Sequence, residues 1–352
     1  HSASARGTAK RVFLIGIDGM GVSGFQQART PNLDALARMG ALSLKTRSVM
    51  PSVSGPNWGS HLLGAGPEQH GITYNGWTTD NHTLEPVITD ADGYFPSLFN
   101  VIRDQMPDAI TAFFYDWNAL ADLYNVSLID QVEFSRGYEA TLDKAMPWII
   151  VNKPDFTFLY FGHPDEVGHA HQWGSKDYLK ALEDVDAALG TFFDALREAG
   201  MFDDSHFIVV SDHGGQGYGH GGLSMEEMQT PWIIAGPGII TNRLIGQPSD
   251  VMNTAATIAY LFQLEVPYAW TGRPVLGAFE HHPLAKENVR AYVPQPFPSI
   301  SSGMYTESDG VEFTVSDPKV KVRFTVDGSD PSSRSPEYKS PILLQKSTTL
   351  KA

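Results

Sequence analysis

The sequence predicts an α/β fold, in which a mostly parallel β-sheet is flanked by helices and followed by a small C-terminal β-sandwich. Two observations predict this arrangement. First, short apolar, β-branched runs alternate with longer segments of helical period, a pattern typical of parallel strands joined by helical connections. Second, the character of the chain changes after about residue 280, where prolines and then short alternating runs replace the helical segments.

The expected strands of the sheet are apolar runs that end at turn-forming or acidic residues. Residues 11–17 (RVFLIGI), 156–161 (FTFLYF) and 206–211 (HFIVVS) are apolar enough to be buried on both faces, as parallel strands usually are. Further strands are expected over 41–50, 109–115 and 232–235.

Helical segments separate these runs. The longest, 175–199, places Leu182, Val185 and Leu189 at the three- and four-residue spacing of one helix face. Residues 31–40 begin with proline and close with glycine, as helices often do. Further helices are expected over 57–63, 96–106 and 138–151.

The C-terminal part has a different composition. The prolines of YVPQPFPSI suit a stiff connection, so we expect a large domain over 1–280, a linker over 281–296 and a β module over 297–352. Short alternating runs at 311–315, 320–326, 342–344 and 348–350, with a turn signal at VDGSDPSS, are the expected strands of that module. The sequence ends within the last of these runs, which predicts a truncated module.

Composition excludes several classes of protein. Lys plus Arg number 25 against 40 Asp plus Glu, so the net charge is −15, and a chain this acidic is not expected to bind a nucleic-acid polymer. No apolar run approaches the roughly 20 residues of a membrane span. Cysteine is absent, which excludes disulfides, thiolate metal sites and a thiol nucleophile.

Acidic and imidazole side chains follow three of the expected strands. Because parallel strands end at one edge of a sheet, these side chains should converge there. Each alone has an ordinary explanation as a helix cap or turn residue, but their coincidence at one edge favours a site. Three carboxylates and three imidazoles suit zinc or another divalent cation, and six ligands divide best between two ions. The residues are Asp18, Asp165, His169, Asp212, His213 and His220.

A nucleophile candidate lies in the segment MPSVSGPN, residues 50–57. A serine just before a short helix faces backbone N–H groups that favour an anion, although a simple helix cap would look the same. Ser52 and Ser54 both fit this description, and composition does not choose between them.

Six motifs in order resemble one family. They are GIDGM (16–20), TPNLDALARMG (30–40), MPSVSGPNWGSHLLGAGPEQHGITYN (50–75), HPDEVGHAHQWG (163–174), SDHGG (211–215) and GHGG…TPWIIAGPGI (219–239). Together they resemble the alkaline phosphatase superfamily, in its type I phosphodiesterase and nucleotide pyrophosphatase branch, with phosphonoacetate hydrolases as near relatives. The C-terminal stretch resembles the immunoglobulin-like module of chitobiases and hexosaminidases.

The resemblance implies an alkaline-phosphatase-like fold with two zinc ions, although other divalent metals fit the same ligands. By position, Asp165, His169 and His220 match one metal site, and Asp18, Asp212, His213 and the nucleophile match the other. The nucleophile position falls on Ser54 rather than Ser52. Asn57 matches a residue that holds a phosphoryl oxygen, and Asn57 and Asn75 are the expected substrate contacts.

The implied activity is hydrolysis of a phosphodiester or pyrophosphate through a covalent phosphoserine. Three features depart from the family pattern: serine replaces threonine as the nucleophile, Gly55 stands where a base-stacking phenylalanine is usual, and FFYDW (113–117) lacks the Lys-x-Arg pair of monoesterases. Trp117, Tyr74 and Trp173 are candidate replacements for the missing aromatic side chain.

Two alternatives stay open. One is a phosphonate or phosphomonoester hydrolase that uses the same site; a sulfatase is disfavoured because no arginine follows Ser54 at the sulfatase spacing. The other is a non-enzymatic surface protein that binds glycans or nucleotides. For the enzyme we expect a small phosphate ester or pyrophosphate as substrate, glycan or cell-surface contact through the module, and a periplasmic, cell-surface or secreted location.

Overall fold

The computed structural model describes residues 9–300, 303–305, 310–315 and 319–352. The chain divides into two compact units, the first ending at Tyr292 and the second beginning at Val293. The short 3₁₀ helix η4 (Pro283–Glu287) and the buried side chain of Tyr292 belong to the first unit. Residues 283–292 of the expected linker therefore include folded, packed structure.

An eight-stranded sheet forms the centre of the first unit, in the order β4-β3-β5-β1-β6-β7-β2-β8. All neighbouring pairs are parallel except those that β7 makes with β6 and β2. The mostly parallel sheet is thus confirmed. The strands are β1 (Arg11–Ile17), β2 (Ala41–Arg47), β3 (Thr111–Tyr115), β4 (Gln131–Phe134), β5 (Phe156–Phe161), β6 (Ser205–Val210), β7 (Gln229–Ala235) and β8 (Arg243–Leu244).

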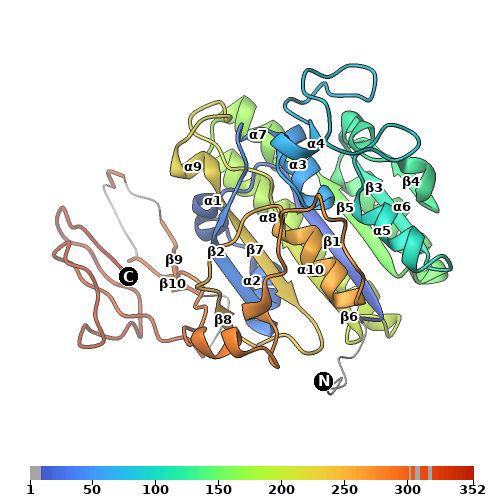
Figure 1. The fold of residues 1–352 in the computed structure, drawn as a ribbon. Helices are drawn as coiled ribbons and strands as arrows, with labels where there is room; N and C mark the ends of the chain where they lie inside the picture. Colours follow the sequence, from blue (N-terminus) through green and yellow to red (C-terminus); the bar gives the residue numbers. More distant parts are fainter. Residues whose placement is uncertain (1–8, 301–302, 306–309, 316–318) are drawn as a thin grey trace. The chain divides into compact units, whose positions relative to one another are not determined.

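Helices cover both faces of this sheet (Figure 1). The face that carries Val12 and Leu14 packs against α3, α5 and α10, and the face that carries Phe13 and Ile15 packs against α1, α2, α6 and α8. This alternation along β1 is the two-residue period of a strand buried on both sides. The bounds are α1 (Val22–Gln27), α2 (Pro31–Met39), α3 (Ser54–Leu63), α5 (Leu98–Gln105), α6 (Tyr138–Asn152), α8 (Lys176–Glu198) and α10 (Asn253–Phe262).

Further short helices lie in the connections between these elements. They are α4 (Pro67–His70), α7 (His163–His171), α9 (Met225–Met228), η1 (Asn118–Leu123), η2 (Val126–Leu128) and η3 (Leu276–Ala278). None of the described helices combines enough length with enough apolar sequence to cross a bilayer.

The structure differs from the sequence-based expectations in two places that matter for the site. Helix α3 begins at Ser54, three residues earlier than expected, so Gly55 and Pro56 lie inside its first turn. Residues 163–171, for which no helix was predicted, form helix α7. Proline suits the first turn of a helix, which explains why Pro56 and Pro164 do not prevent either one.

The second unit contains a small antiparallel pair, β9 (Phe297–Pro298) with β10 (Phe313–Thr314). Isolated bridges pair Val311 with Ile342 and Thr325 with Lys351, which brings three of the expected alternating runs into β contacts. The expected module also includes 301–302, 306–309 and 316–318, which lie outside the described residues.

Candidate metal centre

The six predicted ligands come together at the carboxyl edge of the sheet. Strands β5, β1 and β6 are neighbours, so the segments that follow them meet at one place. Asp18 follows β1, and Asp212 and His213 follow β6. Helix α7, directly after β5, supplies two further ligands, and the sixth, His220, lies in the loop between β6 and β7.

Three of these residues form an outer group. Asp165 and His169 are one turn apart on α7, with His169 Nε2 at 3.6 Å from Asp165 Oδ2. His220 Nε2 lies 3.5 Å from Asp165 Oδ1 and 3.1 Å from His169 Nε2. The His169 side chain is 46% exposed, so this group lies on the solvent side of the cluster.

The other residues form an inner group, which is buried. His213 Nε2 lies 3.0 Å from Asp212 Oδ2 and 3.6 Å from Asp18 Oδ1. Ser54 Oγ is 3.2 Å from the same nitrogen. Asp165 also reaches this group, since ligand atoms of Asp18, Asp165 and His213 lie within 4.8 Å of one another. One carboxylate therefore lies between the inner and outer groups.

Backbone carbonyls orient all three imidazoles in the same way. Nδ1 of His213 contacts the carbonyl of Gly214 at 2.8 Å, that of His169 the carbonyl of Tyr218 at 2.9 Å, and that of His220 the carbonyl of Ser52 at 3.0 Å. A carbonyl can only accept, so each Nδ1 donates its hydrogen and each Nε2 keeps a lone pair when the ring is neutral. The Nε2 atoms of His169 and His220 then face each other at 3.1 Å, an arrangement that favours a cation between them.

Two of the carboxylates, those of Asp18 and Asp212, accept hydrogen bonds from neighbouring groups through one oxygen. Asp18 Oδ2 accepts hydrogen bonds from Trp58 Nε1 at 2.9 Å and from the Tyr160 hydroxyl at 2.5 Å. Asp212 Oδ1 accepts from the backbone N–H of Gly19 at 3.1 Å. The remaining oxygens, Asp18 Oδ1, Asp165 Oδ1 and Asp212 Oδ2, are buried without a hydrogen-bond partner. Buried polar atoms are rarely left in this state, and these three are suited to ligate metal ions.

The electrostatics agree with this interpretation. Burial and the carboxylates of Asp212 and Asp165 raise the pKa of Asp18 well above its usual value. Burial disfavours the charged form of His213, but the carboxylates of Asp212 and Asp18 outweigh it and raise the pKa of His213 to about 10. A buried carboxyl that resists ionisation beside an imidazole that retains its proton marks a place where added positive charge would be stabilised.

The two candidate serines have different surroundings. Ser54 is the first residue of α3 and its hydroxyl faces His213 in the inner group. The Ser52 hydroxyl instead donates to the backbone carbonyl of Gly222 at 2.7 Å. Only the Ser54 hydroxyl is therefore placed against the candidate metal ligands.

The two predicted asparagines also differ, and here the structure departs from the expectation for Asn57. Its side chain is fully buried, its oxygen accepts from Val49 N–H, and its amide nitrogen contacts the carbonyls of Val49, Pro51 and Val53. Both amide hydrogens thus serve the loop before α3, and neither is left for a substrate. Asn75, in contrast, is exposed, and its oxygen accepts from Gly55 N–H at 2.7 Å, which leaves its NH₂ group beside the start of α3.

The aromatic residues near the cluster were not assigned roles from sequence alone, except as stacking candidates. Trp58 and Tyr160 hold Asp18 in place through hydrogen bonds. The only sequence signal for this role is that both are aromatic residues with a polar group within apolar segments, and buried Trp and Tyr usually find a hydrogen-bond partner. Trp173 packs against the rings of His169 and His220, and its Nε1 donates to the backbone carbonyl of Gly19. It therefore helps to hold these two ligand side chains in place. Trp117 lies against Tyr160 and is half-buried.

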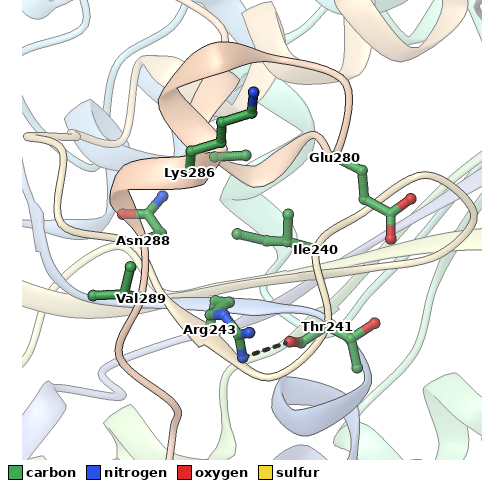
Figure 2. Close-up of a pocket in the computed structure, with 8 residues that line it drawn as sticks. Ile240, Thr241, Arg243, Glu280, Lys286, Asn288 and Val289 are labelled. Carbon is green, nitrogen blue, oxygen red and sulfur yellow. Dashed lines mark hydrogen bonds between the residues drawn. The ribbon is translucent and has the colours of Figure 1, made fainter.

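Figure 2 shows a separate pocket, whose volume is about 580 Å³. Its lining includes Arg243, Lys286 and Glu280. Arg243 pairs with Ala41, the first residue of β2, and β2 runs in the same direction as β1. The pocket is therefore at the amino edge of the sheet, opposite the metal ligands, and contributes nothing to the site.

The fold belongs to a known class, the alkaline-phosphatase-like α/β fold. The structure of murine ectonucleotide pyrophosphatase/phosphodiesterase 5 superposes with a TM-score of 0.62 at 16% sequence identity, over 73% of this chain and 96% of that chain. A phosphonate monoester hydrolase from Silicibacter pomeroyi superposes with a TM-score of 0.59 at 17% identity, over 78% of this chain and 77% of that chain. At these identities the similarity establishes the fold alone.

The family follows from the sequence. Residues 12–228 match the model of the type I phosphodiesterase/nucleotide pyrophosphatase family, and the chain belongs to that family. Residues 300–352 match the chitobiase/β-hexosaminidase C-terminal domain. Rat ectonucleotide pyrophosphatase/phosphodiesterase family member 7 is 23% identical over 219 residues, which are 58% of this chain and 49% of that protein. The chain thus spans about half the length of this relative.

Proposed function

We propose that the chain hydrolyses a phosphodiester or pyrophosphate bond, with Ser54 as the nucleophile and two divalent metal ions, preferably zinc, as cofactors. The observation that carries the proposal is the Ser54 hydroxyl at 3.2 Å from His213 Nε2, beside buried carboxylate oxygens whose polar contacts are with the imidazoles of the same cluster. Asp165, His169 and His220 would hold one ion, and Asp18, Asp212, His213 and Ser54 the other.

The bound metal ions would supply positive charge that favours the alkoxide form of Ser54 and neutralises phosphoryl oxygens. Ser54 Oγ would form a bond to phosphorus as the bond to the leaving oxygen breaks, and water would then cleave the phosphoserine, restoring the hydroxyl. The NH₂ group of Asn75 would donate to a non-bridging oxygen, since its carbonyl is already used by Gly55 N–H. This assigns to Asn75 the contact that Asn57 cannot make.

A diester suits the site better than a monoester. The site-forming stretches 50–77, 113–117, 163–174 and 211–222 contain no Lys or Arg that could complement the additional charge of a monoester. Arg103, which could have folded over the site, is instead bound to the carbonyl of Leu128 and to Asp130. An uncompensated charge should cost roughly tenfold to a thousandfold in rate.

The test compares variants of the full chain loaded with zinc, using a panel of nitrophenyl diesters, monoesters, phosphonates and sulfates. We expect the diester to have the highest kcat/KM. Ser54→Ala should abolish turnover while two zinc ions still bind, and Ser54→Thr should retain activity because it keeps a hydroxyl. Turnover that survives in Ser54→Ala would refute the nucleophile, and a tenfold preference for the monoester would refute the substrate class.

We also propose that this protein works outside the cytoplasm. The support is that the matching relatives are named as ectonucleotide enzymes. Cell fractionation of the native source would test this location, and recovery in the cytoplasm alone would contradict it. The family match of residues 300–352 supports a separate C-terminal module, and its contact with glycans stays a prediction that a glycan array can test.

A further inference from the structure

Two segments far apart in the sequence meet beside the metal ligands. One is the stretch that leads into α3, and the other is the loop that carries His220. Ser52 joins them twice: its hydroxyl donates to the carbonyl of Gly222 at 2.7 Å, and its own carbonyl accepts from His220 Nδ1 at 3.0 Å. The Ser52 side chain is fully buried, so water does not compete for these bonds.

The first half of the His220 loop is held by its own backbone bonds, since Gln216 and Gly219 exchange two hydrogen bonds and Trp173 N–H donates to the carbonyl of Gly217 at 2.9 Å. Its main chain forms neither helix nor extended strand between residues 214 and 224. Glu227 holds it from one side, because Oε1 accepts from Gly222 N–H at 2.9 Å and Oε2 from Ser224 N–H at 3.1 Å. Gly222 is therefore fixed through its N–H by Glu227 and through its carbonyl by Ser52.

We propose that Ser52 is a positioning residue, which ties the nucleophile segment to the His220 loop and holds His220 Nε2 toward the outer metal ion. The proposal rests on the metal centre of the proposed function. Ser52 is two residues from Ser54, so this one residue would fix the position of the nucleophile relative to the outer ligand His220. The Ser52 hydroxyl fixes the loop backbone at Gly222. The Ser52 backbone carbonyl determines which nitrogen of His220 carries the hydrogen.

A purely structural role for Ser52 makes a different prediction. A buried serine that only satisfies a carbonyl would, when replaced by alanine, lower the stability of the fold and leave metal affinity unchanged. Ser205 provides the matched control. It is buried, its hydroxyl donates to the carbonyl of Met201, and it lies at the first residue of β6, at the edge opposite the metal centre.

The experiment is a zinc competition titration of the full chain against a chromophoric chelator, with thermal unfolding measured on the same samples. In Ser52→Ala we expect one of the two sites to weaken about 10- to 100-fold, the usual effect of losing a group that orients a ligand, while the other site is unchanged. Ser52→Thr, which keeps the hydroxyl, should restore the affinity. Saturating zinc should return most of the kcat of Ser52→Ala.

The outcomes separate the two proposals. If the unaltered protein does not bind two zinc ions, the metal centre fails. If it binds two and Ser52→Ala binds both as tightly, with the same thermal destabilisation as Ser205→Ala, the positioning role is overturned and the metal centre stands. Equal weakening of both sites also overturns it. Should Ser52→Ala fail to fold, Glu227→Gln takes its place in the titration, because Glu227 is the half-exposed partner of Gly222. This variant must weaken one metal site and leave the other unchanged.

Discussion

Replacing Gly55 with alanine should impair catalysis through Asn75 rather than through the metal ligands. A Cβ at Gly55 would lie 2.7 Å from the carbonyl oxygen of Tyr74 and 3.1 Å from the Cα of Asn75, both of which are backbone atoms. Ordinary contact begins at 3.4 Å, so the backbone of Tyr74 must move by about 3.4 − 2.7 = 0.7 Å. That shift would displace the Asn75 amide, which is held by Gly55 N–H.

The size of the effect follows from the role of Asn75. Loss of one donor to a developing oxyanion costs about 100- to 1000-fold in kcat, so Asn75→Ala should fall in that range. A donor that is displaced rather than lost should cost less, and we expect Gly55→Ala to lower kcat about 10- to 100-fold, or roughly 1.4–2.7 kcal/mol. Zinc binding should not change, because neither residue is a ligand.

A double-mutant cycle on a nitrophenyl diester, with zinc stoichiometry measured in parallel, provides the assay. If Gly55→Ala acts through Asn75, it should have little further effect in the Asn75→Ala background. Losses that multiply in the double variant would refute the reasoning, as would full activity in Gly55→Ala.

Tyr160→Phe removes a hydrogen bond to Asp18 and should raise one zinc dissociation constant about 10- to 100-fold in a chelator titration, whereas Tyr138→Phe, altered at the surface, should not. Asp186→Ala leaves backbone donors at the start of α2 without their acceptor and should lower the urea unfolding free energy by roughly 2–4 kcal/mol; an unchanged midpoint would contradict this. Burial raises the pKa of Asp116 to about 7, so folding holds a proton that the unfolded chain releases above about pH 4. The stability of the protein relative to that of Asp116→Asn should therefore decline between pH 4 and 7, and a difference that does not change with pH would show that Asp116 does not titrate this way.

The central strands could be predicted closely because burial on both faces leaves a continuous apolar run. Strand β5 has the predicted bounds, and β6 is displaced by one residue. Strand β4, at the sheet edge, is only half-buried and has no such run, so it was not predicted. Helix α7 was also missed, because histidine, glycine and proline are poor helix formers and packing on α8 outweighs their propensity.

The convergence of the six ligands could be predicted because it depends on strand order and on where strands end. The role of Asn57 could not, because it depends on the path of residues 49–53 around the amide. Strand β7 is antiparallel to β6 because the His220 loop, which joins the two strands, begins and ends at the carboxyl edge of the sheet. No local sequence pattern encodes this return of the chain.

The carbonyls that orient the imidazoles have a consequence for mutational surveys. The Tyr218 side chain is 59% exposed, yet its peptide oxygen fixes the ring of His169. Because every amino acid offers the same carbonyl, substitutions at position 218 should be well tolerated, and a scan of side chains would score the position as dispensable. Insertion or deletion of one residue between 214 and 219 would instead shift the peptide group and disturb His169. The tolerance of position 218 to substitution and the intolerance of the loop to changes in length therefore have one origin.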